Sequence, residues 1–238
     1  MIRRLFTCMV LAALVASASA QTAPPPQPEA LVFYAGQPGR LTQDRDRLGG
    51  NPFASALVEV LAKQPSNLDE FTSSLAAANA RHSGGWQQLQ FPKKLPKWKM
   101  DQPAGKRVAL ILINADYSKT DGVYSLPGAA FDAKRIPAAL QKAGFETTLV
   151  LDANADEARE AMAAFSKLSE TAEASVIYVG GHGMQHKRTV YWMSGDYPER
   201  NAKWLDSHAI KLDEIGRVGH AQAVNLVLYA SCRDDPFS

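Results

Sequence analysis

Two short apolar runs in the second half of the chain have the pattern of buried strands. The first, 176–179, is rich in β-branched and aromatic residues and stops at two glycines, and the second, 224–229, has the same character. Continuous runs of this kind are typical of parallel sheets that are covered on both faces. The stretch 156–172 instead carries apolar residues at helical spacing. A second helix is expected over 132–143, since Gly144 is a usual stop signal. The pattern predicts an α/β fold.

A reactive side chain follows each of the two runs. His182 comes after the first and Cys232 after the second. The carboxyl ends of parallel strands meet at one edge of an open α/β sheet, where ligands bind. A thiol at its ordinary pKa needs a neighbouring base to become a nucleophile. We therefore predict that Cys232 is a nucleophile and His182 its base.

Cysteine and histidine also occur in proteins without a catalytic role. A buried cysteine is often an inert small apolar side chain. His182 and His186 have a spacing that suits a metal on a helix. Gly183 between them and the preceding strand favour a turn instead, so we expect no metal ligand.

The segments that contain these residues resemble the caspase-like cysteine peptidases. VGGHGMQ is similar to the histidine turn of the bacterial metacaspase and orthocaspase branch, often YAGHGxQ, and YASCRDDPF to its nucleophile segment, often DACRxNPF. KRVALILINADY resembles the first strand of the family, and LPGAAFDAKRIPAALQKAGFETTLVLDAN the helix and strand that follow it. The resemblance covers about residues 106–238.

The resemblance implies a three-layer α/β fold with a mostly parallel, six-stranded sheet between helices. The family's small-subunit half normally follows the nucleophile, but here 30–91 resembles that half. We therefore predict a circularly permuted chain. Its single folded domain, 30–238, would contain a small-subunit-like part at 30–91, a basic linker at 92–106 and a large-subunit-like part at 107–238.

The predicted permutation has a consequence for activation. The ends of the permuted chain fall where many relatives are cut between their subunits, so we expect this protein to be active without such a cut. Three prolines and several lysines in the linker indicate an exposed, semi-extended connection. Self-cleavage there would be a side effect of a preference for basic residues.

The N-terminal residues resemble a secretory signal peptide. Arg3 and Arg4 precede an apolar stretch, which is followed by an Ala-Ser-Ala ending at residue 20. The apolar stretch is too short and wrongly flanked for a membrane anchor. A proline-rich spacer follows at 21–29. We expect secretion to the periplasm or the exterior of a bacterium. Removal of Cys8 with the signal would leave Cys232 as the one thiol, so no internal disulfide could form.

Charge and composition exclude some partners. The chain has 26 basic and 24 acidic side chains, which gives no electrostatic case for nucleic acid. We expect protein or peptide substrates and no cofactor. No acidic cluster supports the calcium stimulation seen in some metacaspases. The sequence leaves the oligomeric state and the physiological substrate open.

The resemblance also implies a mechanism. Cys232 would attack the peptide carbonyl and form a thioester acyl-enzyme, while His182 gives a proton to the leaving amine. The backbone N–H groups of Gly183 and Cys232 would form the oxyanion hole. Glycine at 183 would let the backbone approach closely.

Residues near the site bear on substrate preference. Aspartate-specific caspases have an arginine where this chain has Leu126. Relatives that cleave after arginine or lysine use acidic residues at two positions. In this chain the first position is Asp132, but the second is Ala230, so one of the two acids is missing. Asp44 is a candidate replacement, and Gly180 would keep the pocket floor open. We predict a basic P1 preference, with Asp132 alternatively serving as a helix N-terminal acid.

Three functions stay open on these observations. The first is an active secreted cysteine endopeptidase. The second is a catalytically silent module that binds peptides in the same groove, suggested by Ala230. The third is a related cysteine hydrolase or transpeptidase of the separase or legumain type.

Overall fold

The computed structural model describes residues 27–237. Its main sheet has five parallel strands in the order β1-β8-β4-β2-β3, and a smaller antiparallel sheet has the order β5-β6-β7. The strands are β1 Ala30–Tyr34, β2 Arg107–Ile113, β3 Glu146–Leu151, β4 Ala174–Gly180, β5 Gly183–His186, β6 Thr189–Met193, β7 Ala209–Lys211 and β8 Val224–Tyr229. The strands predicted at 176–179 and 224–229 are confirmed.

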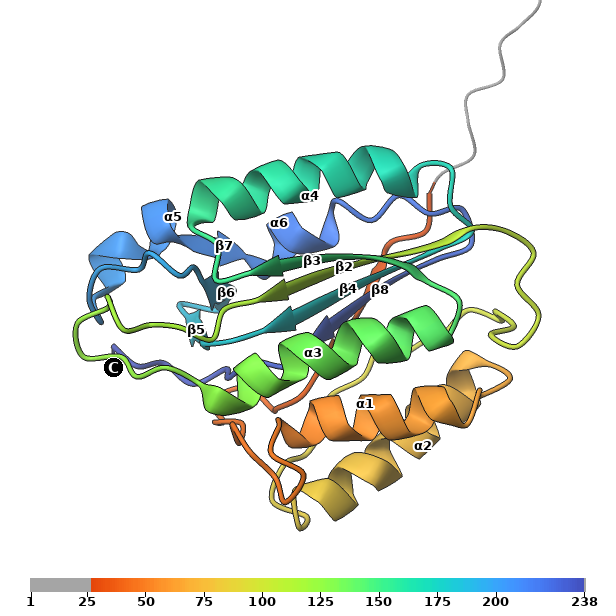
Figure 1. The fold of residues 1–238 in the computed structure, drawn as a ribbon, viewed down its shortest axis with the longest axis horizontal. Coiled ribbons are helices and arrows are strands. Elements are labelled where there is room, and N and C mark those ends of the chain that lie inside the picture. The colour runs from red at the N-terminus through yellow and green to blue at the C-terminus, as the bar shows by residue number, and fades with distance from the viewer. Residues whose placement is uncertain (1–26, 238) are drawn as a thin grey trace, which may run out of the picture.

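Helices cover both faces of the main sheet. Figure 1 shows α3, α1 and α2 on one side and α4 and α6 on the other. The helices are α1 Pro52–Ala62, α2 Leu68–His82, α3 Pro127–Lys142, α4 Ala155–Ser169, α5 Leu205–His208 and α6 Leu212–Gly216, with a short 3₁₀ turn at Ala202–Trp204. This three-layer arrangement agrees with the predicted fold class.

Alternation along the central strands produces two separate cores. In β2, Ile111 and Ile113 pack on the side of α1, α2 and α3, whereas Leu110 and Leu112 pack on the side of α4. Successive strand residues point to opposite faces, and all seven residues of β2 are buried. Double coverage therefore explains why these strands are apolar throughout instead of alternating with polar residues.

The N-terminal part of the chain completes the sheet beside β8, the strand that precedes Cys232. β1 pairs in parallel with β8, from Ala30 opposite Asn225 to Tyr34 opposite Tyr229. In Figure 1, α1 and α2 then lie beyond α3 on the same side of the sheet. Residues 30–91 thus cover an edge of β8 that would otherwise be exposed.

Three details differ from the sequence-based expectations. The described residues form five strands in the main sheet, not six, because the segment before residue 92 makes only an isolated antiparallel bridge between Tyr34 and Gln90. α3 begins at Pro127, five residues before the predicted start. The linker is largely exposed, but Trp98 is buried and its Nε1 donates to Glu173 Oε1 at 2.9 Å.

The signal peptide expected at 1–20 lies outside the described residues, as does most of the spacer at 21–29. Within residues 27–237, no helix has both the length and the apolar character needed to span a bilayer.

Candidate active site

A cleft of about 340 Å³ lies at the carboxyl ends of the main-sheet strands. Ile113, Gly180 and Ala230 reach it from the ends of β2, β4 and β8. The loop between β1 and α1 forms another wall with 41–44 and Asn51. Every candidate site residue named from the sequence, His182 and Cys232 included, lines this cleft.

Cys232 lies three residues beyond the end of β8 and is half-buried. Its Sγ receives the Thr42 N–H at 3.2 Å and lies 3.3 Å from Thr42 Oγ1. Burial raises the pKa of the Cys232 thiol, and the carboxylates of Asp44 and Asp234 act in the same direction, while the Thr42 hydrogen bonds lower it. The thiol is therefore not strongly ionised at neutral pH in the resting site.

His182 follows β4, the strand that pairs with β8. Its Nε2 lies 2.8 Å from the Tyr124 backbone oxygen. A carbonyl oxygen can only accept a hydrogen bond, so Nε2 carries a proton and Nδ1 is the nitrogen available to act as a base. The Tyr117 ring packs edge-on against the imidazole at 4.7 Å, and the His182 N–H donates to the Tyr117 hydroxyl at 3.1 Å.

Burial also sets the charge of the imidazole. It lowers the pKa of His182, although the Tyr124 carbonyl and the carboxylates of Asp44 and Asp234 partly offset this. A lowered pKa keeps His182 neutral at physiological pH, which is the form that can take a proton from a thiol.

Cys232 and His182 share the cleft but are not directly bonded. The hydrogen bonds found within residues 27–237 include Cys232 Sγ with Thr42 and His182 Nε2 with Tyr124, and none between the two side chains. Hydrogen bonds between catalytic groups are often long or poorly aligned before substrate binds. The arrangement is thus compatible with a dyad that closes on substrate.

Gly183 is held where a larger residue would not fit. A Cβ there would lie 2.0 Å from the Tyr229 hydroxyl and 2.6 Å from Ser231 Cβ. Gly183 faces Trp192 in the β5–β6 ladder, and the neighbouring Met193 N–H donates to His182 O. Antiparallel pairs alternate between bonded and non-bonded, so the Gly183 N–H points away from β6.

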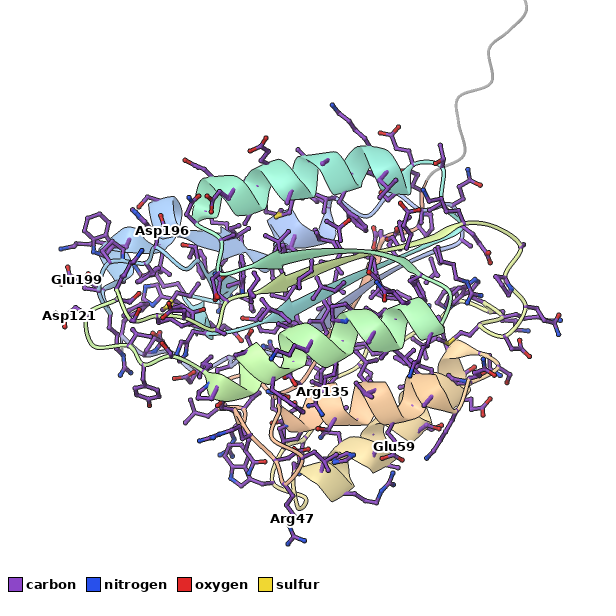
Figure 2. All side chains as sticks on the ribbon, viewed as in Figure 1. Arg47, Glu59, Asp121, Arg135, Asp196 and Glu199 are labelled. Atoms are coloured by element: carbon purple, nitrogen blue, oxygen red, sulfur yellow. The ribbon has the colours of Figure 1, made fainter. Side chains whose placement is uncertain are left out.

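Asp132 lies in the second turn of α3 and is 2% exposed. Oδ1 accepts from Arg135 Nε at 2.8 Å and pairs with Nη2 at 2.7 Å, and Oδ2 accepts the Asn51 N–H at 3.1 Å. Figure 2 shows Arg135 between α3 and α1. Burial raises the pKa of Asp132 to about 7, although Arg135 and the Asn51 N–H oppose the shift. Asp132 is therefore a cleft acid that already has an internal cation.

Asp44 is tied to the start of α3. Its carboxylate accepts the Gly128 N–H at 3.0 Å and the Ala129 N–H at 3.3 Å. These are free donors in the first turn of the helix, and a carboxylate there also complements the helix dipole. The role considered for Asp132 at the helix N-terminus thus falls to Asp44, because α3 begins earlier than predicted.

Gly180 and Ala230 form apolar parts of the same cleft. A Cβ on Gly180 would lie 3.2 Å from a Tyr178 ring carbon and 3.3 Å from Ile113 Cγ1, so glycine leaves room there. The Ala230 backbone oxygen accepts from Asn51 Nδ2 at 3.2 Å. Ala230 contributes no charge where relatives have an acid.

The structure adds site residues that the sequence did not indicate. Thr42, Tyr124, Arg200 and Asp234 line the cleft, and Arg135 lies behind it. Arg200 belongs to a loop that pairs with the Tyr124 loop through Asp121 and Glu199, both labelled in Figure 2. The lining thus has three acidic side chains and one arginine, and Arg135 behind the cleft pairs with one of these acids, Asp132.

The two histidines whose spacing was considered for a metal do not lie on a helix. His186 lies in β5, and its Nδ1 is 3.1 Å from Asp235 Oδ2. In residues 27–237, no three or more histidine, cysteine or acidic side chains are grouped so that they could hold a metal.

No curated protein matches the chain. The family model of the caspase domain matches residues 106–238, which contain β2 to β8 together with His182 and Cys232. Membership of this family supports the interpretation of the chain as a cysteine-type peptidase. The match covers more than half of the sequence, and the chain therefore belongs to the caspase domain family.

Proposed function

We propose that this protein is a cysteine endopeptidase with Cys232 as nucleophile and His182 as base. The observation that carries the proposal is the position of both residues. They follow adjacent strands, β8 and β4, and line one cleft within the part of the chain that matches the caspase domain.

The chemistry starts from a neutral pair. The thiol has a raised pKa and the imidazole a lowered one, both because of burial. His182 Nδ1 takes the thiol proton as Cys232 Sγ attacks the substrate carbonyl, and the imidazolium then protonates the leaving amine. A thioester to Cys232 remains and is hydrolysed by water, with His182 again acting as base.

The developing oxyanion needs donors that are already in place. We assign this role to the Gly183 and Cys232 N–H groups. Support comes from the Gly183 N–H, which points away from β6. It also comes from the backbone bonds that fix the Cys232 segment: the Gly39 N–H donates to Arg233 O, and the Arg233 N–H donates to Arg40 O. The reaction so described requires no cofactor.

We further propose that the chain is a circularly permuted member of the family. β1 lies against β8 although it precedes the matched region by many residues, and α1 and α2 pack on the same side as α3. The 92–106 segment then connects the two parts. On this proposal the intact chain is active without cleavage between subunit-like parts.

The preferred P1 residue is proposed to be arginine or lysine. Three acidic side chains, Asp132, Asp44 and Asp234, line the cleft, and the charges of Arg200 and of Arg135 behind it offset them only in part. Internal donors already engage Asp132 and Asp44, so a basic head must use their remaining lone pairs. We therefore expect a preference, not an absolute requirement.

The test is a panel of fluorogenic peptides with arginine, lysine, aspartate or a neutral residue before the scissile bond. Wild-type protein should cleave the two basic substrates fastest, and Cys232→Ala should cleave none. Peptide binding without cleavage by reduced wild-type protein would instead favour the silent binding module, for which Ala230 is the motivating observation. Transfer of the acyl group to an added amine would indicate a transpeptidase.

The P1 preference should depend on pH through Asp132. The pKa of about 7 means that this acid is largely protonated at pH 6 and ionised at pH 8. The ratio of kcat/KM for arginine over a neutral P1 residue should therefore rise between these values by roughly 3- to 10-fold, since a charge-assisted hydrogen bond is worth about 1.5–3 kcal/mol.

The matched variant is Asp132→Asn, which keeps the shape but removes the titration. It should show a lower ratio that no longer changes with pH. A wild-type pH dependence that persists in Asp132→Asn would assign the effect to another group, such as Asp234.

We also propose export from the cytoplasm, on the sequence pattern of residues 1–20. Expression of the full chain in a bacterium, followed by fractionation and N-terminal sequencing, should recover protein that begins near Gln21 outside the inner membrane. Unprocessed protein in the cytoplasmic fraction would contradict this.

A further inference from the structure

Thr42 belongs to the loop between β1 and α1, outside the region that matches the caspase domain. The segment before it is bonded to the nucleophile segment at several points. The Ala35 N–H donates to Tyr229 O at 2.8 Å, the Gly39 N–H to Arg233 O at 2.9 Å and the Arg233 N–H back to Arg40 O at 3.0 Å. The position of Thr42 is thus fixed relative to Cys232.

Both groups of Thr42 that can donate a hydrogen bond contact the sulfur. Its backbone N–H, which can only donate, lies 3.2 Å from Cys232 Sγ, and its hydroxyl oxygen lies 3.3 Å away. The other acceptor for that hydroxyl, Ala230 O, is more distant at 3.5 Å. The thiol proton has a weak alternative partner in Thr42 O at 3.8 Å. A sulfur that loses this proton keeps two donors from one residue.

We propose that Thr42 is a positioning residue that stabilises the Cys232 thiolate with its N–H and hydroxyl donors. This inference rests on the proposed role of Cys232 as nucleophile and deepens it. Hydrogen bonds to an ionised acceptor are about twice as strong as neutral ones, so both bonds strengthen when the proton leaves. The N-terminal part of the chain thereby supplies a piece of the nucleophile's environment.

Other ionisable groups also act on the sulfur. The carboxylates of Asp44 and Asp234 disfavour the thiolate. Tyr229 is buried nearby and interacts electrostatically with Cys232. His182 and Arg200 line the same cleft. A substitution confined to the Thr42 hydroxyl leaves all these groups in place, so its effect on the thiol can be attributed to that donor.

The test is the rate of Cys232 alkylation by iodoacetamide as a function of pH in the full-length protein. Mass spectrometry of the Cys232 peptide separates this thiol from Cys8. Thr42→Val has the same shape without the hydroxyl, and its alkylation midpoint should rise by about one pH unit. Thr42→Ser keeps the donor and should stay close to wild type.

An unchanged midpoint in folded Thr42→Val, or the same shift in Thr42→Ser, would overturn the proposal. Thr42→Ala is the second variant if valine prevents folding, as judged by a cooperative thermal transition. Because no peptide is involved, the result is independent of peptidase activity. A wild-type protein that cleaves no peptide, with the Thr42→Val shift present, would overturn the proposed function and leave this inference standing.

Discussion

Replacing His182 with alanine is expected to lower kcat/KM for an arginine peptide by about 10²- to 10⁴-fold, the usual contribution of a general acid–base group. A large loss of activity is expected because the pKa of the Cys232 thiol is raised. A buried thiol without a base is a poor nucleophile, and no other histidine lines the cleft within the described residues. The measurement is steady-state hydrolysis by folded, reduced protein.

Two variants serve as controls for this result. Cys232→Ala should remove the remaining thiol-dependent rate. His220→Ala alters a histidine in the loop before β8, away from the cleft, whose backbone N–H donates to Ser169 Oγ. It should stay within about threefold of wild type, because surface substitutions have small effects. A His182→Ala variant that retains more than a tenth of the activity would contradict the assigned base.

Residues 106–238 expressed alone are expected not to fold, although they include the whole caspase-domain match. Without β1, strand β8 has an exposed edge beside the nucleophile. The missing part also supplies large side chains that are at most 1% exposed: Phe33, Phe53, Leu57, Phe71 and Leu75. Burial of each is worth about 1.5–3 kcal/mol, and together they rival a typical total stability of about 5–15 kcal/mol.

The matched control is a chain interrupted in the exposed 101–104 stretch of the linker. Its two pieces, coexpressed, should copurify and cleave peptides, because the contacts between β1 and β8 do not need the connection. Circular dichroism should show a cooperative thermal transition for the pair and none for 106–238 alone. A cooperative transition in the isolated fragment would show that the N-terminal part is not needed for folding.

The strands that hold the two reactive residues could be predicted from the sequence. Burial on both faces makes β4 and β8 apolar throughout, and the glycine turn after β4 marks where His182 leaves the sheet. The carboxyl ends of adjacent parallel strands then bring His182 and Cys232 to one cleft, as predicted. Hydrophobic pattern and strand polarity are local properties, which is why they were sufficient here.

The finer contacts depend on loops and could not be predicted in this way. Thr42 and Cys232 are 190 positions apart, and no local pattern indicates that they meet. Arg135 neutralises Asp132 through the geometry of α3, whose start was predicted five residues too late from the sequence. The Tyr124 contact with His182 is made by a backbone oxygen. Every residue has such an oxygen, so the residue type at position 124 does not indicate the contact.

The sixth strand of the main sheet, which was predicted from the family resemblance, is not formed by the described residues. There is a physical reason for this difference. Only Gln90 bridges to Tyr34, because the backbone oxygens of Leu89 and Gln87 accept from the side chains of Gln37 and Asn79. Gln90 Oε1 accepts from Arg233 at 2.6 Å, and Gln87 is bonded to Asn79. These side-chain contacts hold the segment against the fold without a continuous ladder.

Covalent trapping of the nucleophile tests the central claim most directly. A peptidyl chloromethyl ketone with arginine at P1 places its ketone where the substrate carbonyl would lie, so that the adjacent chloromethyl carbon can alkylate the thiol with loss of chloride. Mass mapping should find a single adduct on Cys232, formed faster than with a neutral P1 residue and slowed strongly in His182→Ala. Folded, reduced protein that forms no adduct at Cys232, or reacts there at the same rate whatever the peptide, would contradict a peptidase site in this cleft.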